Sequence, residues 1–510
     1  MDISPLQKKR LEYKPRIPAL LKDLNHLVFE EAPPIRKPQE ELRKLFPCTF
    51  DQSAYRLIKG APKRRALKVG VVFSGGQAAG GHNVIAGLFD ALKEIDAGSE
   101  LIGFLGGPSG IVENAARTLT QQEIDAVRNQ GGFDLIGSGR TKIETAEQLA
   151  SSLEACKNLD GLVIIGGDDS NTNAAILAEY FLEKGCRAKV VGVPKTIDGD
   201  LRSEEIEISF GFDSACKTYA ELIGNIARDA LSAKKYYHFI KLMGRSASHI
   251  ALECALSARP NLALIGEEGK GLYQIVGEIA DLVCRRKEAG KEYGVILVPE
   301  GLVEFMPEIK NLIGELNAQK LSEKGKALFA ELPEAVQKQL TLEKDPHGNV
   351  QVSQIQTEVL LMEFVKRELK KRGFKGKFSA QEHFLGYEGR ACMPSNFDAN
   401  YCYALGKLAA LTVRDGLTGM ICSAQNLKGE AEEWKMKAVP IVQLMHFEVR
   451  KGKEKPVIRK ALVDINQGPF VYFSRLRKNW EIEDRYRYPG PIQFFGDAEL
   501  TDSVPLILKV

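Results

Sequence analysis

Residues 162–172 read LVIIGGDDSNT, and this stretch decides the fold class of the chain. The apolar run at 162–165 ends at the glycine pair Gly166 and Gly167, and a helix-like segment, 171–184, follows directly. A short, fully apolar run before a glycine-marked turn and a helix is typical of a strand buried inside a parallel sheet. The stretch therefore predicts one strand-turn-helix unit of an α/β fold.

The same alternation extends on both sides of this unit. Further short apolar runs, several of them ending in Gly or Ser, alternate with helical stretches such as 214–233. These runs occupy residues 67–73, 101–104, 190–193, 239–242, 262–265, 295–298 and 420–423. The pattern predicts an α/β fold made of two Rossmann-like, three-layer domains with parallel-rich sheets.

The segments outside these units divide the chain further. Residues 1–66 are rich in proline and charge and show no clear strand pattern, so we expect an N-terminal extension of short helices and loops. Residues 303–380 carry heavy charge at helical spacing and predict a helical insertion. We expect a first α/β domain at 67–213 and 395–450, a second at 214–394 that contains the insertion, and a C-terminal segment, 451–510, that packs on both domains.

Composition and charge exclude several classes of protein. The chain has 70 Lys or Arg and 67 Asp or Glu, so its net charge of +3 offers no overall field for nucleic acid or an anionic membrane. No uninterrupted apolar run reaches the roughly 18 residues of a membrane span. The nine cysteines are scattered without C-x-x-C pairs, which argues against a zinc site or a disulfide framework. We therefore expect a cytoplasmic protein whose anionic ligands are held by a local site.

Glycines cluster where the first apolar run ends, in residues 74–83, which read SGGQAAGGHN. Glycines at a strand-to-helix turn let backbone N–H groups converge on a phosphate, assisted by the N-terminus of the helix. The loop matches neither G-x-G-x-x-G nor the Walker pattern, which argues against hydride-transfer enzymes and P-loop kinases. A tight turn without a ligand is the ordinary alternative, and this loop alone does not separate the two.

Acidic residues follow the run at 162–165. Asp168 and Asp169 lie at the carboxyl end of the predicted strand, where open α/β sheets bind ligands. Asp168 is suited to hold Mg²⁺, which uses one or two carboxylates together with phosphate oxygens. An Asp that only caps the next helix is the alternative, and two adjacent acids behind a glycine pair make it weaker.

The most informative loop, residues 194–200, reads PKTIDGD and again follows a predicted strand. It holds a cation, Lys195, a hydroxyl, Thr196, and two acids in alternate positions, Asp198 and Asp200. A carboxylate that takes the proton of an attacking hydroxyl and a cation that stabilises developing charge are the parts of phosphoryl transfer. The loop predicts a phosphotransferase, and an Asp-Gly turn beside a solvated lysine is the alternative.

In sequence and in order, these loops resemble those of the 6-phosphofructokinases. The shared motifs are the glycine loop at Gly75, GGDDS at 166–170, TIDGD at 196–200, MGR at 243–245, PEG at 299–301 and YEGR at 387–390. The resemblance covers about residues 67–300 and 381–450. It implies a Mg²⁺-dependent enzyme that phosphorylates the 1-hydroxyl of fructose 6-phosphate to give fructose 1,6-bisphosphate.

The resemblance also implies roles for the residues of the first domain. Asp198 would be the general base, Thr196 would lie against the reacting group, and Asp200 would support the loop and the metal environment. Asp168 would bind the magnesium ion. The contacts to the phosphoryl donor would be Gly76 and Arg140.

On the sugar side, the resemblance implies a binding segment for fructose 6-phosphate. Glu300 would accept a sugar hydroxyl, and the guanidinium of Arg390 suits the 6-phosphate bidentately. The implied sugar-phosphate residues are Met243, Gly244, Arg245, Glu300, Tyr387, Glu388, Gly389 and Arg390. Lys235 and Tyr236 match the stretch that reaches into the neighbouring subunit's site, which implies a homodimer with shared active sites.

Two positions indicate pyrophosphate as the donor. Family members that use ATP usually have Gly where this chain has Asp169 and Asn where it has Gly199. A carboxylate at Asp169 would meet the α-phosphate of ATP with bulk and like charge. Lys195 would stabilise charge on the transferred phosphate, so the loop resembles the pyrophosphate-dependent, long-chain branch of the family.

Two other functions remain open at the level of sequence. One is an ATP-dependent phosphofructokinase that tolerates Asp169. The other is a non-catalytic regulatory subunit that binds sugar phosphates on the same fold. A subunit without catalysis need not keep a base, a metal site and a phosphate clamp together, so the retained Asp198, Asp168 and Arg245 argue against the second.

Overall fold

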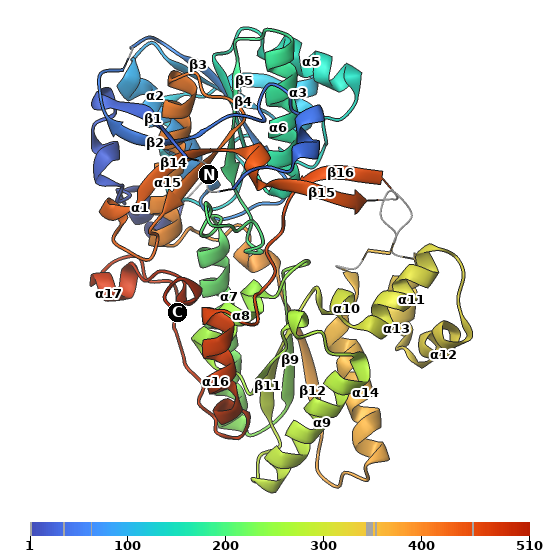
Figure 1. Cartoon of the computed structure of the whole chain (residues 1–510). Helices are drawn as coiled ribbons and strands as arrows, with labels where there is room; N and C mark the ends of the chain where they lie inside the picture. Colours follow the sequence, from blue (N-terminus) through green and yellow to red (C-terminus); the bar gives the residue numbers. More distant parts are fainter. Residues whose placement is uncertain (1–2, 34–35, 63, 343–349, 352–353, 451–452) are drawn as a thin grey trace. The chain divides into compact units, whose positions relative to one another are not determined.

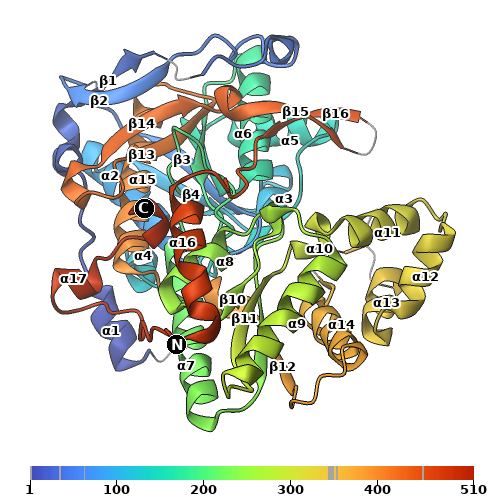
Figure 2. The same cartoon turned by 60° about the horizontal axis from the view of Figure 1, so that its bottom comes forward.

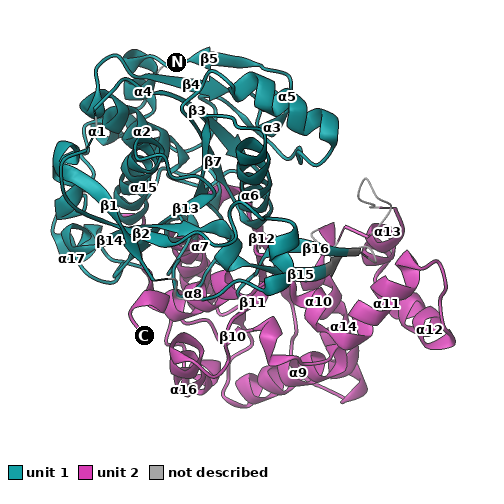
Figure 3. Ribbon diagram, turned by 45° about the horizontal axis from the view of Figure 1, so that its top comes forward, with its two compact units in different colours: residues 1–215, 389–461, 493–504 teal, residues 216–388, 462–492, 505–510 magenta. Residues whose placement is uncertain are grey.

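The structure is a computed structural model that describes the chain except residues 1–2, 34–35, 63, 343–349, 352–353 and 451–452. Parts of the expected extension, insertion and C-terminal segment therefore lie outside the described residues. The chain forms two compact units, shown in separate colours in Figure 3. Unit 1 consists of residues 1–215, 389–461 and 493–504, and unit 2 of residues 216–388, 462–492 and 505–510.

Unit 1 is built on one large sheet with the order β1-β2-β14-β13-β8-β7-β3-β4-β5, in which β6 also pairs with β3. The strands from β13 to β4 run parallel, and the outer pairs are antiparallel. The bounds are β1 (Leu27–Ala32), β2 (Ala54–Lys59), β3 (Lys68–Ser74), β4 (Glu100–Phe104), β5 (Ala116–Thr118), β6 (Ser138–Gly139), β7 (Gly161–Gly166), β8 (Lys189–Pro194), β13 (Met420–Gln425) and β14 (Lys435–Pro440).

Helices cover both faces of this parallel core (Figure 1). On one face lie α2 (Gly81–Ile95) and α15 (Asn396–Arg414), and on the other α3 (Pro108–Val112), α5 (Ala146–Cys156) and α6 (Asp168–Glu183). The central strands are buried on both sides, as their continuous apolar runs require. The backbones of α2 and α15 approach each other closely at Gly87. A Cβ at this position would lie only 2.2 Å from the Tyr403 carbonyl oxygen, so there is no room for a side chain.

The expectation that residues 1–66 hold only helices and loops was wrong. Strands β1 and β2 pair with each other, and β2 continues onto the antiparallel strand β14. Only Ala54 and Leu57 of β2 are buried, so the strand has no two-residue alternation to reveal it in the sequence. Its partner β14 lies far along the chain, and this long-range pairing selects the strand conformation.

Unit 2 has a smaller, fully parallel sheet with the order β10-β11-β9-β12. Its strands are β9 (Tyr237–Leu242), β10 (Leu262–Ala263), β11 (Gly294–Pro299) and β12 (Ala380–Leu385). Strand β10 is shorter than the apolar run at 262–265, because a 3-10 turn begins at Gly266. Figure 2 shows α9 (Leu272–Glu288) beside α14 (Thr357–Lys371). Helix α16 (Gly468–Ile482) contacts both α8 (His249–Ala258) and α9, and Arg285 of α9 forms an ion pair with Glu481 of α16.

The helical insertion is present as expected in its described residues. It contains α10 (Leu302–Phe305), α11 (Pro307–Asn317), α12 (Glu323–Glu331) and α13 (Glu334–Leu342), followed by α14. Buried apolar residues such as Met306, Leu340 and Leu360 join these helices to the core of unit 2. The insertion is therefore a continuation of one core, and its charged residues form the outer face.

The remaining elements complete the two units. Unit 1 also contains α1 (Pro5–Leu11), α4 (Gln121–Val127), α17 (Ala498–Thr501) and the antiparallel hairpin of β15 (Met445–Arg450) and β16 (Lys453–Ile458). Helix α7 (Phe212–Ala233) carries the chain from unit 1 into unit 2. Within the described residues, no helix is long and apolar enough to cross a membrane. The expected α/β class with parallel-rich sheets is confirmed.

Candidate active site

The loops predicted to carry the chemistry of unit 1 follow three neighbouring strands. Strands β3, β7 and β8 are parallel, and their last residues are level, since Phe73 pairs with Ile165 and Gly166 with Pro194. Strands β4 and β7 lie on opposite sides of β3, so the strand order reverses at this point. Open α/β sheets bind ligands at the carboxyl ends of strands beside such a reversal. The three loops therefore begin at one edge, where a ligand is expected.

The glycine loop after β3 is surrounded by cationic side chains. A Cβ placed on Gly76 would lie 2.7 Å from a terminal nitrogen of Arg390 and 3.6 Å from one of Arg140. The Nζ of Lys195 donates a hydrogen bond to the Gly76 carbonyl oxygen at 2.7 Å. Glycine at this position thus leaves room where three cationic groups approach, which is the arrangement that a phosphate group requires.

Lys195 is almost completely buried in this loop region. Burial lowers the pKa of its ammonium from 10.5 to about 8. Asp198 and Asp168 act in the opposite direction, while Arg390 and Arg140 favour the uncharged form as well. An anion that enters the site would raise the pKa of Lys195 again, because a nearby negative charge stabilises the charged form of the ammonium.

Two carboxylates from different loops share one cation beside the glycine loop. The Nζ of Lys460 lies 3.7 Å from Oδ2 of Asp168 and 3.6 Å from Oδ2 of Asp200. Burial raises the pKa of Asp168 above its usual value, and the charge of Lys460 opposes this effect. The two acids therefore form a negatively charged site, and the ammonium group of Lys460 supplies a positive charge beside it.

Asp169 lies at the surface of the same helix terminus. Its carboxylate forms an ion pair with the Nζ of Lys142 at 3.1 Å, and about half of its side chain, 48%, is exposed. Both Asp168 and Asp169 belong to the first turn of α6, where the helix dipole favours negative charge. The N-cap residue of α6 is Gly167, so neither acid has the helix-capping role that was the alternative interpretation of the sequence.

The loop after β8 holds Asp198 in a fixed turn. The Asp198 backbone N–H donates to the Thr196 hydroxyl at 3.1 Å, and the Ser209 hydroxyl donates to the Thr196 carbonyl oxygen. Gly199 has φ of +74°, a left-handed conformation that disfavours side chains. Asp198 is half-buried, so its side chain stays partly accessible, whereas Asp200 is buried.

The sugar-side residues of unit 2 also follow neighbouring parallel strands. Met243, Gly244 and Arg245 come after β9, and Glu300 comes after β11, which pairs with β9. The buried carboxylate of Glu300 accepts a hydrogen bond from the Gly244 N–H at 2.9 Å. Met243 is half-buried and Arg245 is exposed. Unit 2 thus brings Glu300 and the segment 243–245 together, as the motifs predict for one binding surface.

The YEGR motif is divided between the two units. Tyr387 and Glu388 belong to unit 2, where Tyr387 is 69% exposed and Glu388 accepts the Gly386 N–H. Gly389 and Arg390 belong to unit 1. There, Arg390 donates to the Gln77 side chain at 2.6 Å, beside the glycine loop. The structure therefore places Arg390 with the donor-side residues of its unit, and its role as a 6-phosphate clamp stays a prediction.

Lys235 and Tyr236 lie at the surface of unit 2, directly before β9. Tyr236 is 38% exposed and has φ of +67°, and the nearby Lys234 has φ of +50°. Left-handed conformations are uncommon for residues other than glycine and mark segments with a constrained shape. The exposure of this segment is compatible with the predicted contact with a second subunit, which stays a prediction.

Sequence reasoning missed Lys460, Lys142 and Gln77. Lys142 stands two residues after the predicted Arg140, and Gln77 directly follows Gly76, so closeness to a motif was their only signal. Lys460 comes after β16, in a segment without a recognisable motif. Its place beside Asp168 and Asp200 depends on long-range packing of that hairpin, which no local pattern reveals.

Comparison with known proteins agrees with this arrangement. The family model described as phosphofructokinase matches residues 68–413. A Treponema pallidum protein named pyrophosphate–fructose 6-phosphate 1-phosphotransferase is 47% identical over 100% of this chain and 97% of its own length. The beta 1 subunit of the enzyme of that name from Arabidopsis thaliana is 48% identical over 99% of this chain and 94% of its own length.

A solved structure supports the fold independently. The pyrophosphate-dependent phosphofructokinase of Nitrosospira multiformis matches with a TM-score of 0.58 at 19% identity, over 86% of this chain and 96% of the other. The family model spans more than half of this chain, and the relatives align with it almost from end to end. The chain therefore belongs to the phosphofructokinase family.

Proposed function

We propose that the protein reversibly transfers a phosphoryl group from pyrophosphate to the 1-hydroxyl of fructose 6-phosphate, giving fructose 1,6-bisphosphate and phosphate. The full-length relatives carry the name of this activity. The observation that carries the proposal is the cluster of Lys195, Arg140 and Arg390 around Gly76. Three cationic groups at one glycine loop suit a compact, highly charged donor.

The surroundings of Asp169 favour pyrophosphate over ATP. Its carboxylate stands at the N-terminus of α6, next to Asp168, and is held by Lys142. A nucleotide that extended past the second phosphate at this terminus would meet the negative charge of Asp169. Pyrophosphate ends at its second phosphate and avoids this contact. Lys195 supplies the positive charge that pyrophosphate needs in place of a bound nucleoside.

Asp198 is the proposed general base. Its half-buried carboxylate, fixed by the turn with Thr196, takes the proton of the 1-hydroxyl as that oxygen attacks the phosphorus atom. Lys195 and the guanidinium groups hold the donor in line and stabilise the charge on the phosphate that leaves. In the reverse direction, protonated Asp198 returns the proton to the sugar oxygen.

The acids beside the glycine loop fit a magnesium ion. Asp168 would hold it, with Asp200 close by, and a cation already stands 3.7 and 3.6 Å from their oxygens in the form of Lys460. Among the described residues there is no cluster of three metal-ligating side chains. Mg²⁺ does not need one, because it commonly uses one or two carboxylates plus substrate phosphates. When bound, the ion neutralises charge on the phosphates.

Unit 2 supplies the proposed residues for the sugar phosphate. Glu300, fixed by the Gly244 N–H, accepts a sugar hydroxyl, and exposed Arg245 is available to an anionic phosphate. A carboxylate buried to 3% exposure and oriented by a backbone donor is a specific acceptor. Tyr387 and Glu388 complete the set that we propose contacts fructose 6-phosphate.

We also propose a cytoplasmic homodimer in which Lys235 and Tyr236 reach the partner's active site. The exposed, constrained segment at these residues supports the proposal. Sedimentation of the purified protein tests the assembly. Mixing the inactive variants Asp198→Asn and Tyr236→Ala tests sharing, because mixed dimers would regain one intact site, whereas unshared sites would leave the mixture inactive.

The activity is tested with purified protein, fructose 6-phosphate and Mg²⁺, with pyrophosphate and ATP compared as donors. Activity with pyrophosphate alone, lost in Asp198→Asn, is the expected result. Asparagine keeps the shape of the side chain and removes the proton acceptor, so a folded, inactive variant isolates the base. Preference for ATP would overturn the roles given to Asp169 and Lys195. Inactivity with both donors would favour a regulatory subunit.

A further inference from the structure

A lysine from the end of the β15–β16 hairpin is held against the proposed catalytic loops. Lys460 lies outside residues 68–413, which the family model matches. The backbone on both sides of it is fixed, because the Ile458 N–H donates to the Thr172 hydroxyl at 3.2 Å and the Ala461 N–H to the Asp200 carbonyl oxygen at 2.7 Å. These bonds tie the chain around Lys460 to α6 and to the loop after β8.

The ammonium of Lys460 is placed between two acids that would otherwise repel each other. It lies 3.7 Å from an oxygen of Asp168 and 3.6 Å from an oxygen of Asp200, and those side chains are only 20% and 7% exposed. Asp168 begins α6 shortly after β7, and Asp200 lies in the loop that follows the adjacent strand β8. At such distances and burial, a shared cation compensates the repulsion and sets the separation of the two loops.

We propose that Lys460 is a positioning residue for phosphoryl transfer. Its ammonium holds Asp168 and Asp200 in their working arrangement, and it competes with the metal ion for their negative charge until the metal and pyrophosphate are both bound. This inference rests on the proposed function. It assigns a role in the reaction to the C-terminal part of the chain, which lies outside the sequence motifs that follow the strands of the two sheets.

Replacement of the lysine by methionine separates the charge from the packing. Lys460→Met keeps a long apolar stem and removes the cation, so kcat should fall roughly 10- to 100-fold, as is usual when a residue that orients a metal ligand is lost. The KM for fructose 6-phosphate should stay nearly unchanged. Mn²⁺, added alone as a probe of the metal site, should bind about tenfold more tightly, since its competitor at under 4 Å is gone.

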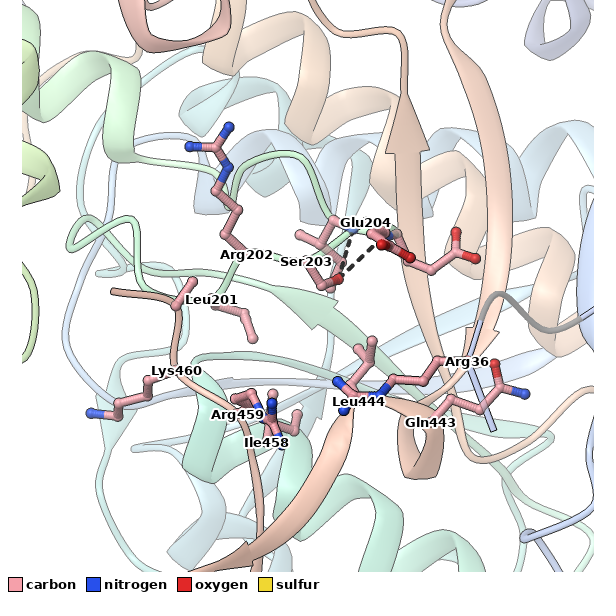
Figure 4. A pocket seen from close by; sticks show the side chains of 13 residues that line it. Arg36, Leu201, Arg202, Ser203, Glu204, Gln443, Leu444, Ile458, Arg459 and Lys460 are labelled. Carbon is pink, nitrogen blue, oxygen red and sulfur yellow. Dashed lines mark hydrogen bonds between the residues drawn. The ribbon is translucent and has the colours of Figure 1, made fainter. Parts of the chain in front are cut away.

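Two further variants make the comparison sharp. Lys460→Arg keeps the charge; Lys460 is one of the residues that line a cavity of about 450 Å³, together with Leu201 and Arg459 (Figure 4). This variant should recover most of the activity. Lys455→Met removes a lysine from β16, the strand that precedes Lys460, where it pairs with Glu144 at 3.5 Å on the surface. It should change neither kcat nor Mn²⁺ binding.

The experiment measures steady-state kinetics with pyrophosphate, Mn²⁺ binding by electron paramagnetic resonance in the absence of substrates, and the thermal midpoint of each variant. Lower kcat with tighter Mn²⁺ binding in Lys460→Met, and recovery in Lys460→Arg, would support the proposal. Unchanged Mn²⁺ affinity, or weaker binding together with a lower midpoint, would overturn it. An inactive wild-type protein would refute the proposed function instead, and the Mn²⁺ comparison would still decide the role of Lys460.

Discussion

Lys195 gives the sharpest prediction, because its charge depends on pH in the range where the enzyme can be assayed. Burial lowers the pKa of its ammonium from 10.5 to about 8 in the folded protein. Each tenfold change in the proton equilibrium is worth about 1.4 kcal/mol, so the buried charge costs the free protein about 3 kcal/mol below pH 8. This cost disappears as the pH rises from 8 to 10.5, because in this range the folded protein has released the proton while the unfolded chain still holds it.

The ammonium is proposed to stabilise charge in the transition state, so kcat/KM for pyrophosphate should fall as the pH rises through about 8. In Lys195→Arg this decline should be absent, because a guanidinium stays protonated. Lys195→Met should lose about 100- to 1000-fold in kcat at pH 7, the usual loss for a preorganised group of this kind. The same variant should be more stable than the wild-type protein at pH 7, by up to about 3 kcal/mol.

The assay follows fructose 1,6-bisphosphate formation from pH 6.5 to 9.5 at constant free Mg²⁺, and urea unfolding at pH 7 gives the stability. A wild-type profile that stays flat through pH 8, or a decline that persists in Lys195→Arg, would refute the assignment. Lower stability of Lys195→Met at pH 7 would show that the buried ammonium is fully compensated by its neighbours.

Three other changes have defined outcomes. Asp169→Gly should raise the ratio of kcat/KM for ATP over pyrophosphate by about 10- to 100-fold, because a like charge is removed; an unchanged ratio would exclude Asp169 as the selector. Gly76→Ala should lower kcat/KM for pyrophosphate about 100-fold with an unchanged thermal midpoint, since its Cβ would displace Arg390 from 2.7 Å; wild-type kinetics would contradict the cradle. Arg286→Met should destabilise the protein by about 3 kcal/mol in urea unfolding, because Asp484 would lose a buried partner at 2.9 Å; a loss within error would contradict this.

The parallel strands and their loops could be predicted because their signal is local. Runs such as 162–165 are buried on both faces, and the glycines and acids after them stand at the carboxyl ends by geometry alone. Strand β12 was not predicted, since only Leu385 in it is buried and its pattern is not alternating. Strand β2 was missed for the same reason.

The site was predictable only as far as single loops reach. The sequence places Asp168 and Asp198 after strands, but it does not show that Lys195 is buried or that Arg390 stands at Gly76. The position of Lys460 depends on a hairpin that packs on α6, where the Ile458 N–H donates to the Thr172 hydroxyl. Such contacts are determined by the packing of segments that are distant in the sequence, and the hydrophobic periodicity of one segment gives no information about them.

The division of the chain into units has a consequence for its synthesis on the ribosome. The sheet of unit 1 begins with β1 at Leu27, yet its strands β13 and β14 begin only at Met420 and Lys435. The sheet of unit 2 is complete at Leu385. While the chain is growing, β8 therefore presents an unpaired edge, a feature that favours aggregation. The sheet that starts first is finished last, so the nascent protein should depend on chaperones until residue 440 has emerged.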